Sequence, residues 1–163
     1  NWMIHVAIEQ CQPGDIMVIA PTSFSDAGYF GDLLGASLKA HGVSGVVLDA
    51  GCRDIAVLRE AGFPVWSKAI SAQGTVKETL GDVNIPIVCA GQIVHPGDVI
   101  VADDDGIVVV PRLQADEIAK KSAAREARED QIRARYDAGE LGIDINNMRP
   151  RLAEKGLVYK DME

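Results

Sequence analysis

Residues 31–54, GDLLGASLKAHGVSGVVLDAGCRD, decide the expected fold. The first half has the apolar spacing of a helix of about three turns, and Gly42 is placed to end it. The apolar face expected for this helix consists of Leu33, Leu34, Leu38 and Ala40. Residues 46–48 (VVL) form a continuous apolar run, which is typical of a strand covered on both faces. The stretch therefore predicts a helix followed by a buried strand, as in α/β proteins.

Charged residues flank this helix–strand unit at one end. Arg53 and Asp54 follow the strand, and ligands of open α/β sheets bind at the carboxyl ends of strands. Free N–H groups at the start of the helix, near Asp32 and Leu33, suit an anion. Arginine offers a planar fork to a carboxylate, and aspartate offers a hard oxygen to a divalent cation. We therefore expect a site for a metal-bound carboxylic acid, although ordinary surface charge would have the same spacing.

The composition narrows the class of protein. With 163 residues, 47% of them hydrophobic, a single domain over residues 1–163 is the simplest expectation. The net charge of −8 argues against nucleic acid and anionic membranes as partners. No apolar run approaches the roughly 18 residues of a membrane span, and no signal peptide is visible. The sequence begins inside a helical pattern, so we expect residues upstream of Asn1 to be missing.

The cysteines indicate a reducing compartment. There are three of them, an odd number, and no C-x-x-C spacing occurs. They are Cys11, Cys52 and Cys89. We expect unpaired thiols in a cytoplasmic protein, with an activated Cys52 thiolate beside Arg53 as the less favoured alternative.

The rest of the chain is expected to alternate short strands with loops before a long helix. Expected helices cover 1–10, 54–61, 113–138 and 150–155, and expected strands cover 16–20, 64–68, 85–88, 99–102 and 107–110. Two similar segments, QPGDIMVIA at 12–20 and HPGDVIVAD at 95–103, each predict a Pro-Gly turn that leads into a strand. Asp103–Gly106 is expected to be a hairpin turn rather than a metal cluster.

The predicted long helix carries a carboxylate on a mixed apolar face. Spacings of four and three place on one face Ile118, Ser122, Arg125, Glu129, Ile132 and Tyr136. The segment from 113 to 163, with its tail from 141, looks too extended for a second domain. We expect it to contact a neighbouring subunit.

Other kinds of chemistry have less support. The three histidines are far apart and the cysteines do not cluster, so a zinc site is poorly supported and any metal is expected to be Mg²⁺ or Mn²⁺ bound by oxygen. Lys68 and Lys77 are the lysines to test for Schiff-base chemistry, with a structural or substrate-contacting role favoured for Lys68. No nucleotide-binding loop of either common kind occurs.

Specific motifs resemble a known family. Asp32, twenty intervening residues and then Arg53-Asp54 match the D-x20-R-D pattern of the family named for the regulator of ribonuclease activity A. Within that family, four segments between 64 and 106 look like the 4-hydroxy-4-methyl-2-oxoglutarate / 4-carboxy-4-hydroxy-2-oxoadipate aldolases. They are PVWSKA, QGTVKETLG, PIVCAG and HPGDVIVADDDG.

The resemblance implies a fold, an assembly and an activity. The fold would be a β/β/α "swivelling" domain, assembled as a trimer or hexamer with active sites shared between subunits. The activity would be that of a divalent-metal-dependent (class II) pyruvate aldolase, a carbon–carbon lyase of aromatic acid degradation. It would cleave 4-carboxy-4-hydroxy-2-oxoadipate to pyruvate and oxaloacetate, or 4-hydroxy-4-methyl-2-oxoglutarate to two pyruvates, and decarboxylate oxaloacetate as a side activity.

Residue roles follow from the same resemblance. Asp54 would ligate Mg²⁺ or Mn²⁺, Arg53 would hold the pyruvyl carboxylate or keto oxygen, and Asp32 would orient an acid/base water. The N–H groups of Leu33 and Leu34 would close on the substrate carboxylate, and Glu129 would join the metal shell from the adjacent subunit. A rival from another class is a non-catalytic protein that binds and inhibits a ribonuclease. A third alternative is a Schiff-base aldolase that uses Lys68.

Overall fold

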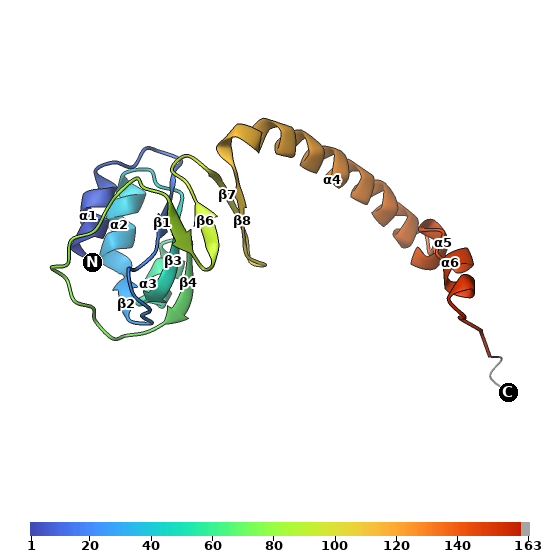
Figure 1. The fold of residues 1–163 in the computed structure, drawn as a ribbon, viewed down its shortest axis with the longest axis horizontal. Coiled ribbons are helices and arrows are strands. Elements are labelled where there is room, and N and C mark those ends of the chain that lie inside the picture. The colour runs from blue at the N-terminus through green and yellow to red at the C-terminus, as the bar shows by residue number, and fades with distance from the viewer. Residues whose placement is uncertain (161–163) are drawn as a thin grey trace. The chain divides into compact units, whose positions relative to one another are not determined.

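The computed structural model describes residues 1–160, which form two compact units divided after Arg112. The first unit alternates short helices and strands, with two antiparallel hairpins at its end (Figure 1). In chain order its elements are α1 (Trp2–Ile8), β1 (Ile16–Ile19), β2 (Gly28–Phe30), α2 (Asp32–Ala40), β3 (Gly45–Cys52), α3 (Ile55–Glu60), β4 (Val65–Ile70), β5 (Ile87–Cys89), β6 (Gln92–Val94), β7 (Val99–Ala102) and β8 (Ile107–Val110).

Strand β3 is the centre of a four-stranded parallel sheet. Its first half pairs with β1, its end pairs with β2, and β4 pairs along nearly its whole length. A strand has two edges, so β1 and β2 share one edge of β3 and β4 occupies the other. Seven of the eight residues of β3 are buried, which confirms the predicted strand covered on both faces.

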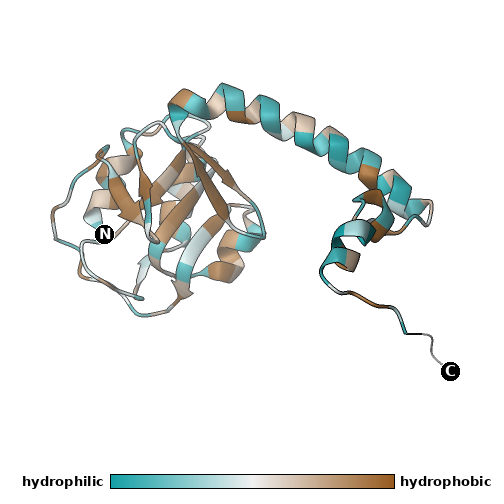
Figure 2. Ribbon diagram, turned by 45° about the vertical axis from the view of Figure 1, so that its right-hand side comes forward, coloured by the Kyte–Doolittle hydropathy of each residue, from teal (hydrophilic) through white to brown (hydrophobic). Residues whose placement is uncertain are grey.

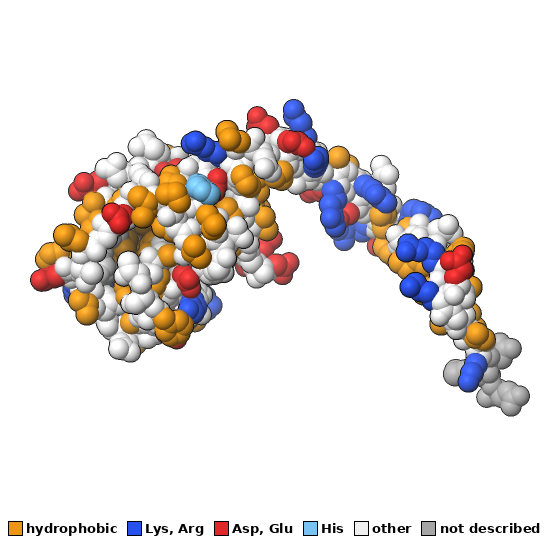
Figure 3. Space-filling view, in the orientation of Figure 1, with side chains coloured by type: hydrophobic (Ala, Val, Ile, Leu, Met, Phe, Trp, Pro, Cys, Tyr) orange, Lys and Arg blue, Asp and Glu red, His pale blue; other side chains and the backbone are white. Residues whose placement is uncertain are grey.

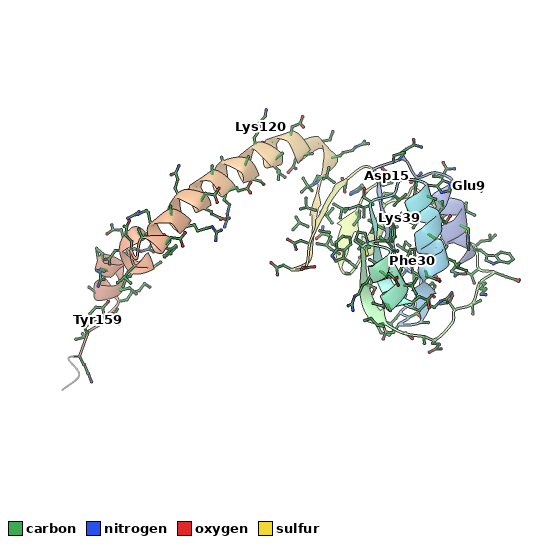
Figure 4. The ribbon with its side chains drawn as sticks, turned by 180° about the vertical axis from the view of Figure 1, so that it is seen from behind. Glu9, Asp15, Phe30, Lys39, Lys120 and Tyr159 are labelled. Carbon is green, nitrogen blue, oxygen red and sulfur yellow. The ribbon has the colours of Figure 1, made fainter. Side chains whose placement is uncertain are left out.

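Each face of this sheet has its own hydrophobic core. Helices α1, α2 and α3 cover one face, with Phe30, Leu38 and Val46 fully buried between them and the sheet (Figures 1 and 4). The hairpins β5–β6 and β7–β8 cover the other face around Val47, Cys89 and Val94. Most of the strands are largely hydrophobic (Figure 2). The first unit thus has the expected β/β/α layers.

The two Pro-Gly-Asp segments have the same local structure. In each, the aspartate carboxylate accepts a hydrogen bond from the backbone N–H three residues earlier: Gln12 N to Asp15 Oδ2 at 2.8 Å, and His95 N to Asp98 Oδ2 at 2.9 Å. Each turn then leads into a strand, β1 or β7. The expected shared structural role of the two segments is confirmed.

The second unit is helical. After a 3₁₀ turn at Arg112–Gln114 come α4 (Ala115–Asp137), α5 (Gly142–Ile145) and α6 (Arg149–Glu154). Lys, Arg, Asp and Glu side chains crowd the surface of α4 (Figure 3). Gly139, with φ of 86°, follows the end of α4, where the helix expected over 113–138 also ends. Among the described residues, no helix is both long and apolar enough to cross a membrane.

Several details differ from the expectations. Leu33 and Ala40 are exposed, so the buried face of α2 is narrower than predicted and consists of Leu34, Gly35 and Leu38. Short strands β2 and β6 and the one-turn helix α5 were not predicted, because three or four residues carry too little periodicity to be recognised. The other predicted helices and strands are confirmed, with boundaries shifted by a few residues.

Candidate functional site

The structure brings Asp32, Arg53 and Asp54 together at the carboxyl end of β3. Asp54 Oδ2 accepts a hydrogen bond from the backbone N–H of Asp32 at 3.3 Å. The same oxygen lies 3.3 Å from Nε of Arg53, in a hydrogen-bonded ion pair. The side chains of Arg53 and Asp54 are 36% and 37% exposed, so the pair lies on an open rim that a small anion could reach.

Asp54 has an unusual backbone conformation. Its φ of 57° and ψ of 34° lie in the left-handed region, which only aspartate, asparagine and glycine adopt readily. It occupies the N-cap of α3, yet its side chain makes no capping hydrogen bond there and reaches the start of α2 instead. A residue held in this region often marks a functional site, because the surrounding structure must stabilise it.

The first turn of α2 differs from the expectation in one respect. The N–H of Asp32 was predicted to face a bound anion, but it donates to the carboxylate of Asp54. The N–H groups of Leu33 and Leu34 also lie in this first turn, where a helix has no carbonyl four residues earlier to accept them. The positive end of the α2 dipole therefore stabilises the Asp54 carboxylate and any further anion beside it.

Arg53 is held by the backbone as well as by Asp54. Its Nη1 donates to the carbonyl oxygen of Gly28 at 3.2 Å, and its backbone N–H donates to the carbonyl oxygen of Phe30 at 2.9 Å. These two acceptors lie in β2, beside the end of β3. The guanidinium thus has a fixed orientation and retains N–H groups for a carboxylate.

Two glycines allow the backbone to approach this site. A Cβ at Gly31 would lie 2.4 Å from Asp54 Oδ2, and a Cβ at Gly51 would lie 2.1 Å from the carbonyl oxygen of Asp26. Any side chain at either position would displace the groups that hold Arg53 and Asp54. Sequence reasoning missed both glycines as site residues, although each lies within three residues of a predicted one.

Cys52 precedes Arg53 but is not an activated thiol. It is fully buried, and burial followed by the nearby Asp54 carboxylate raises the pKa of the Cys52 thiol to about 11. A thiol with this pKa stays protonated at neutral pH and is a poor nucleophile. The alternative of a reactive thiolate is therefore wrong, and all three cysteines are free, as expected.

Two other candidate residues form ion pairs of their own. Lys68 on β4 forms an ion pair with Asp49 at 3.6 Å. Glu129 belongs to α4 in the second unit, where its Oε1 is 2.6 Å from Nε of Arg125. Within residues 1–160 no three His, Cys, Asp or Glu side chains gather as a metal-binding group would require. A metal at Asp54 would therefore take its remaining ligands from water or from another chain.

Comparisons with known proteins show the family of this chain. The sequence profile of the RraA-like family, described as Aldolase/RraA, matches residues 1–109. A Halalkalibacterium halodurans protein with the provisional name 4-hydroxy-4-methyl-2-oxoglutarate aldolase is 31% identical over 83% of this chain. The chain spans 64% of that relative's length.

Two solved structures share the fold. A crystal structure of a protein from Pseudomonas syringae pv. tomato superposes with a TM-score of 0.75 at 29% identity, covering 82% of this chain and 68% of that one. RraAS2 of Streptomyces coelicolor, described as an unusual member of the RNase ES inhibitor RraA protein family, has a TM-score of 0.72 at 33% identity, over 81% of this chain and 68% of that one. The chain belongs to the RraA-like family and has its α/β fold.

Proposed function

We propose that this protein is a divalent-metal-dependent (class II) pyruvate aldolase. Its substrates would be 4-hydroxy-4-methyl-2-oxoglutarate, 4-carboxy-4-hydroxy-2-oxoadipate or both, with decarboxylation of oxaloacetate as a side activity. The observation that carries the proposal is the convergence of a fixed guanidinium, a carboxylate and a helix N-terminus at the carboxyl end of β3. The aldolase name of the Halalkalibacterium halodurans relative supports it.

The donors fit a hard divalent cation. Asp54 presents an exposed carboxylate, and Mg²⁺ and Mn²⁺ prefer oxygen ligands, often including several waters. One carboxylate with waters is a weak site alone. We therefore infer that Glu129 of an adjacent subunit completes it, in a trimer or hexamer with shared active sites. In the isolated chain Arg125 holds the Glu129 carboxylate and would have to yield it.

The chain's own residues bind the substrate and move the proton. Arg53 pairs with the pyruvyl carboxylate, with the N–H groups of Leu33 and Leu34 closing on the same group. The Asp32 carboxylate, through a water that it orients, accepts the proton of the C4 hydroxyl as the C3–C4 bond breaks. That bond's electron pair passes to the pyruvyl fragment, and a proton returned through the same water to C3 gives pyruvate. When bound, the metal supplies Lewis-acid stabilisation of the charge on the 2-oxo group.

The test measures pyruvate release from both substrates, coupled to lactate dehydrogenase. We expect turnover with added Mg²⁺ or Mn²⁺ that is abolished by excess EDTA and by Asp54→Asn, which keeps the size of the side chain and removes its charge. Asp105→Asn, in the exposed turn between β7 and β8, is the matched control for the loss of one carboxylate charge. If turnover survives EDTA and borohydride traps a covalent enzyme–substrate adduct, the reaction would instead use a Schiff base on a lysine such as Lys68.

One observation favours a second function. RraAS2, with a TM-score of 0.72 to this chain, is described as a member of an RNase inhibitor family. A net charge of −8 would suit docking on a basic partner. On this alternative the folded protein would release no pyruvate from either substrate with or without metal, and would slow RNA cleavage by an RNase E-type ribonuclease in a salt-dependent manner.

A further inference from the structure

The loop of residues 21–27, named here the crossing loop, passes over the end of β3. The N–H of Gly51 donates to the carbonyl oxygen of Ala27 at 3.0 Å. The loop is so close that a Cβ on Gly51 would lie 2.1 Å from the carbonyl oxygen of Asp26. The next residue, Gly28, supplies the carbonyl oxygen that accepts from Nη1 of Arg53. The crossing loop therefore leads directly into the carbonyl that orients Arg53. Gly28 is also held by its pairing with Gly51 and by its N–H, which donates to the carbonyl oxygen of Gln73 at 2.7 Å.

A lysine holds the outer part of this loop. The ammonium of Lys68 lies 4.0 Å from the centre of the Phe24 ring, in a cation–π contact. Phe24 is 78% exposed and takes no part in either hydrophobic core. The contact with Lys68 is thus the ring's attachment to the sheet.

Lys68 is itself fixed to the centre of the sheet. Its ammonium is 3.6 Å from Oδ1 of Asp49 on β3. The other oxygen of Asp49 accepts a hydrogen bond at 2.9 Å from the N–H of Ala90, in the turn between β5 and β6. Asp49 is only 23% exposed, so this ion pair is better shielded from solvent than one at a fully open surface. A continuous set of contacts thus joins β3, Lys68, Phe24 and the crossing loop.

Lys68 also faces a groove. It lines a groove of about 1070 Å³ beside β4, together with Asp49 and Arg59, and neither Arg53 nor Asp54 lines this groove. The contacts of Lys68 are with Asp49 and Phe24.

We propose that Lys68 is a positioning residue. It holds Phe24 and the crossing loop, and the loop in turn keeps the Gly28 carbonyl where it orients the Arg53 guanidinium. The inference rests on the proposed aldolase function. Because Arg53 binds the pyruvyl carboxylate before and during the reaction, loss of its orientation weakens substrate and transition state alike, so KM rises while kcat stays.

The test combines steady-state kinetics with amide hydrogen exchange of the full chain. Lys68→Met and Phe24→Leu should each raise KM for 4-hydroxy-4-methyl-2-oxoglutarate by about three- to fivefold, with kcat within about twofold. The double variant should be no worse than either single one, because both remove the same contact. Lys68→Arg should restore KM, since a guanidinium also pairs with a carboxylate and with a ring. Arg59→Met is the matched control, a cation of the same groove with no ion pair within residues 1–160.

Hydrogen exchange separates this inference from the proposed function. Amides of residues 22–28 should exchange faster in Lys68→Met than in the wild type, and those of β1 should not. An unchanged KM in an active Lys68→Met variant, or additive effects of the two changes, would overturn the positioning role. If kcat were lost in Lys68→Arg too, the amine would have a chemical role, and the positioning role would be overturned. If the wild type were inactive, the proposed function would fail, and exchange in Lys68→Met would still show whether the lysine holds the loop.

Discussion

The two units of this chain stabilise their helices in different ways. In the first unit, side chains such as Phe30, Leu38 and Val46 are fully buried against a central sheet. In the second, no described residue is buried, and the largest helix, α4, is tied by exposed ion pairs such as Arg125–Glu129. Helices in water usually need a buried face, so the first unit is stable through its own core, whereas α4 has no buried face among the described residues.

Phe30→Ala should cause the largest loss of stability among the variants that test this difference. Phe30 is fully buried and its ring stacks on that of Phe63, with centroids 6.3 Å apart. Removing the ring from a core of this kind costs about 3–5 kcal/mol of unfolding free energy. Leu113→Ala is the control in the second unit, because Leu113 is 91% exposed and its truncation should cost less than about 0.5 kcal/mol. Urea denaturation measures both. A cost for Leu113 as large as that for Phe30 would show that an assembly covers it.

Glycine substitutions give the next largest contrast. Gly51→Ala would place a methyl group 2.1 Å from a backbone oxygen of the crossing loop. We expect the free energy of unfolding to fall by about 2–4 kcal/mol and Arg53 to lose its function. At Gly139 a Cβ would have open space around it, and only the left-handed φ of 86° would be strained. Gly139→Ala should therefore lower the free energy of unfolding by about 1 kcal/mol. Thermal unfolding ranks the two, and equal effects would contradict the close approach at Gly51.

Alkaline pH should destabilise the first unit through Cys52. The folded thiol has a pKa of about 11, raised above the roughly 8.5 of an unfolded cysteine. Between these values the unfolded chain loses its proton and the folded protein keeps it, so stability is full below about pH 8.5 and falls as pH rises toward 11. The fall should reach about 3 kcal/mol. In Cys52→Ala the slope of unfolding free energy against pH should be shallower over this range. An unchanged slope would show that Cys52 contributes nothing to it.

The smallest expected effect concerns the ion pair of α4. Arg125 and Glu129 are four residues apart and exposed, and such pairs contribute little because solvent and salt screen them. Arg125→Ala should leave the main thermal transition unchanged and reduce helical circular dichroism slightly. At high salt the difference from the wild type should vanish. A large drop in melting temperature would mean that Arg125 is covered in the assembled protein.

Much of the fold was predictable from sequence because long apolar patterns determine it. The continuous run at 46–48 and the helical spacing after Asp32 identified β3 and α2, and these two elements place the site. The exposure of Leu33 was not predictable, since one residue at the edge of an apolar face fits either side of a helix. The short strands β2 and β6 form through pairing with distant partners rather than through their own sequence.

The proximity of the candidate site residues was predictable from the sequence, but their contacts were not. Asp32, Arg53 and Asp54 meet as expected from the end of a parallel strand. The left-handed conformation of Asp54, the crowding at Gly31 and Gly51, and the loop held by Lys68 depend on backbone positions that no pattern of residue types specifies. The role of Glu129 stays a prediction, because it depends on a second subunit.

A mixture of two inactive variants tests the proposed shared metal site most directly. Asp54→Asn damages the site in the first unit, and Glu129→Gln damages the carboxylate proposed to reach that site from an adjacent subunit. Each variant alone, folded and assembled, should release little pyruvate from 4-hydroxy-4-methyl-2-oxoglutarate in the presence of Mg²⁺. Co-expressed, they should recover a clear fraction of wild-type activity, because mixed assemblies contain some sites with both carboxylates intact. If Glu129→Gln alone were fully active, or if the mixture were as inactive as its parts, the shared metal site would be contradicted.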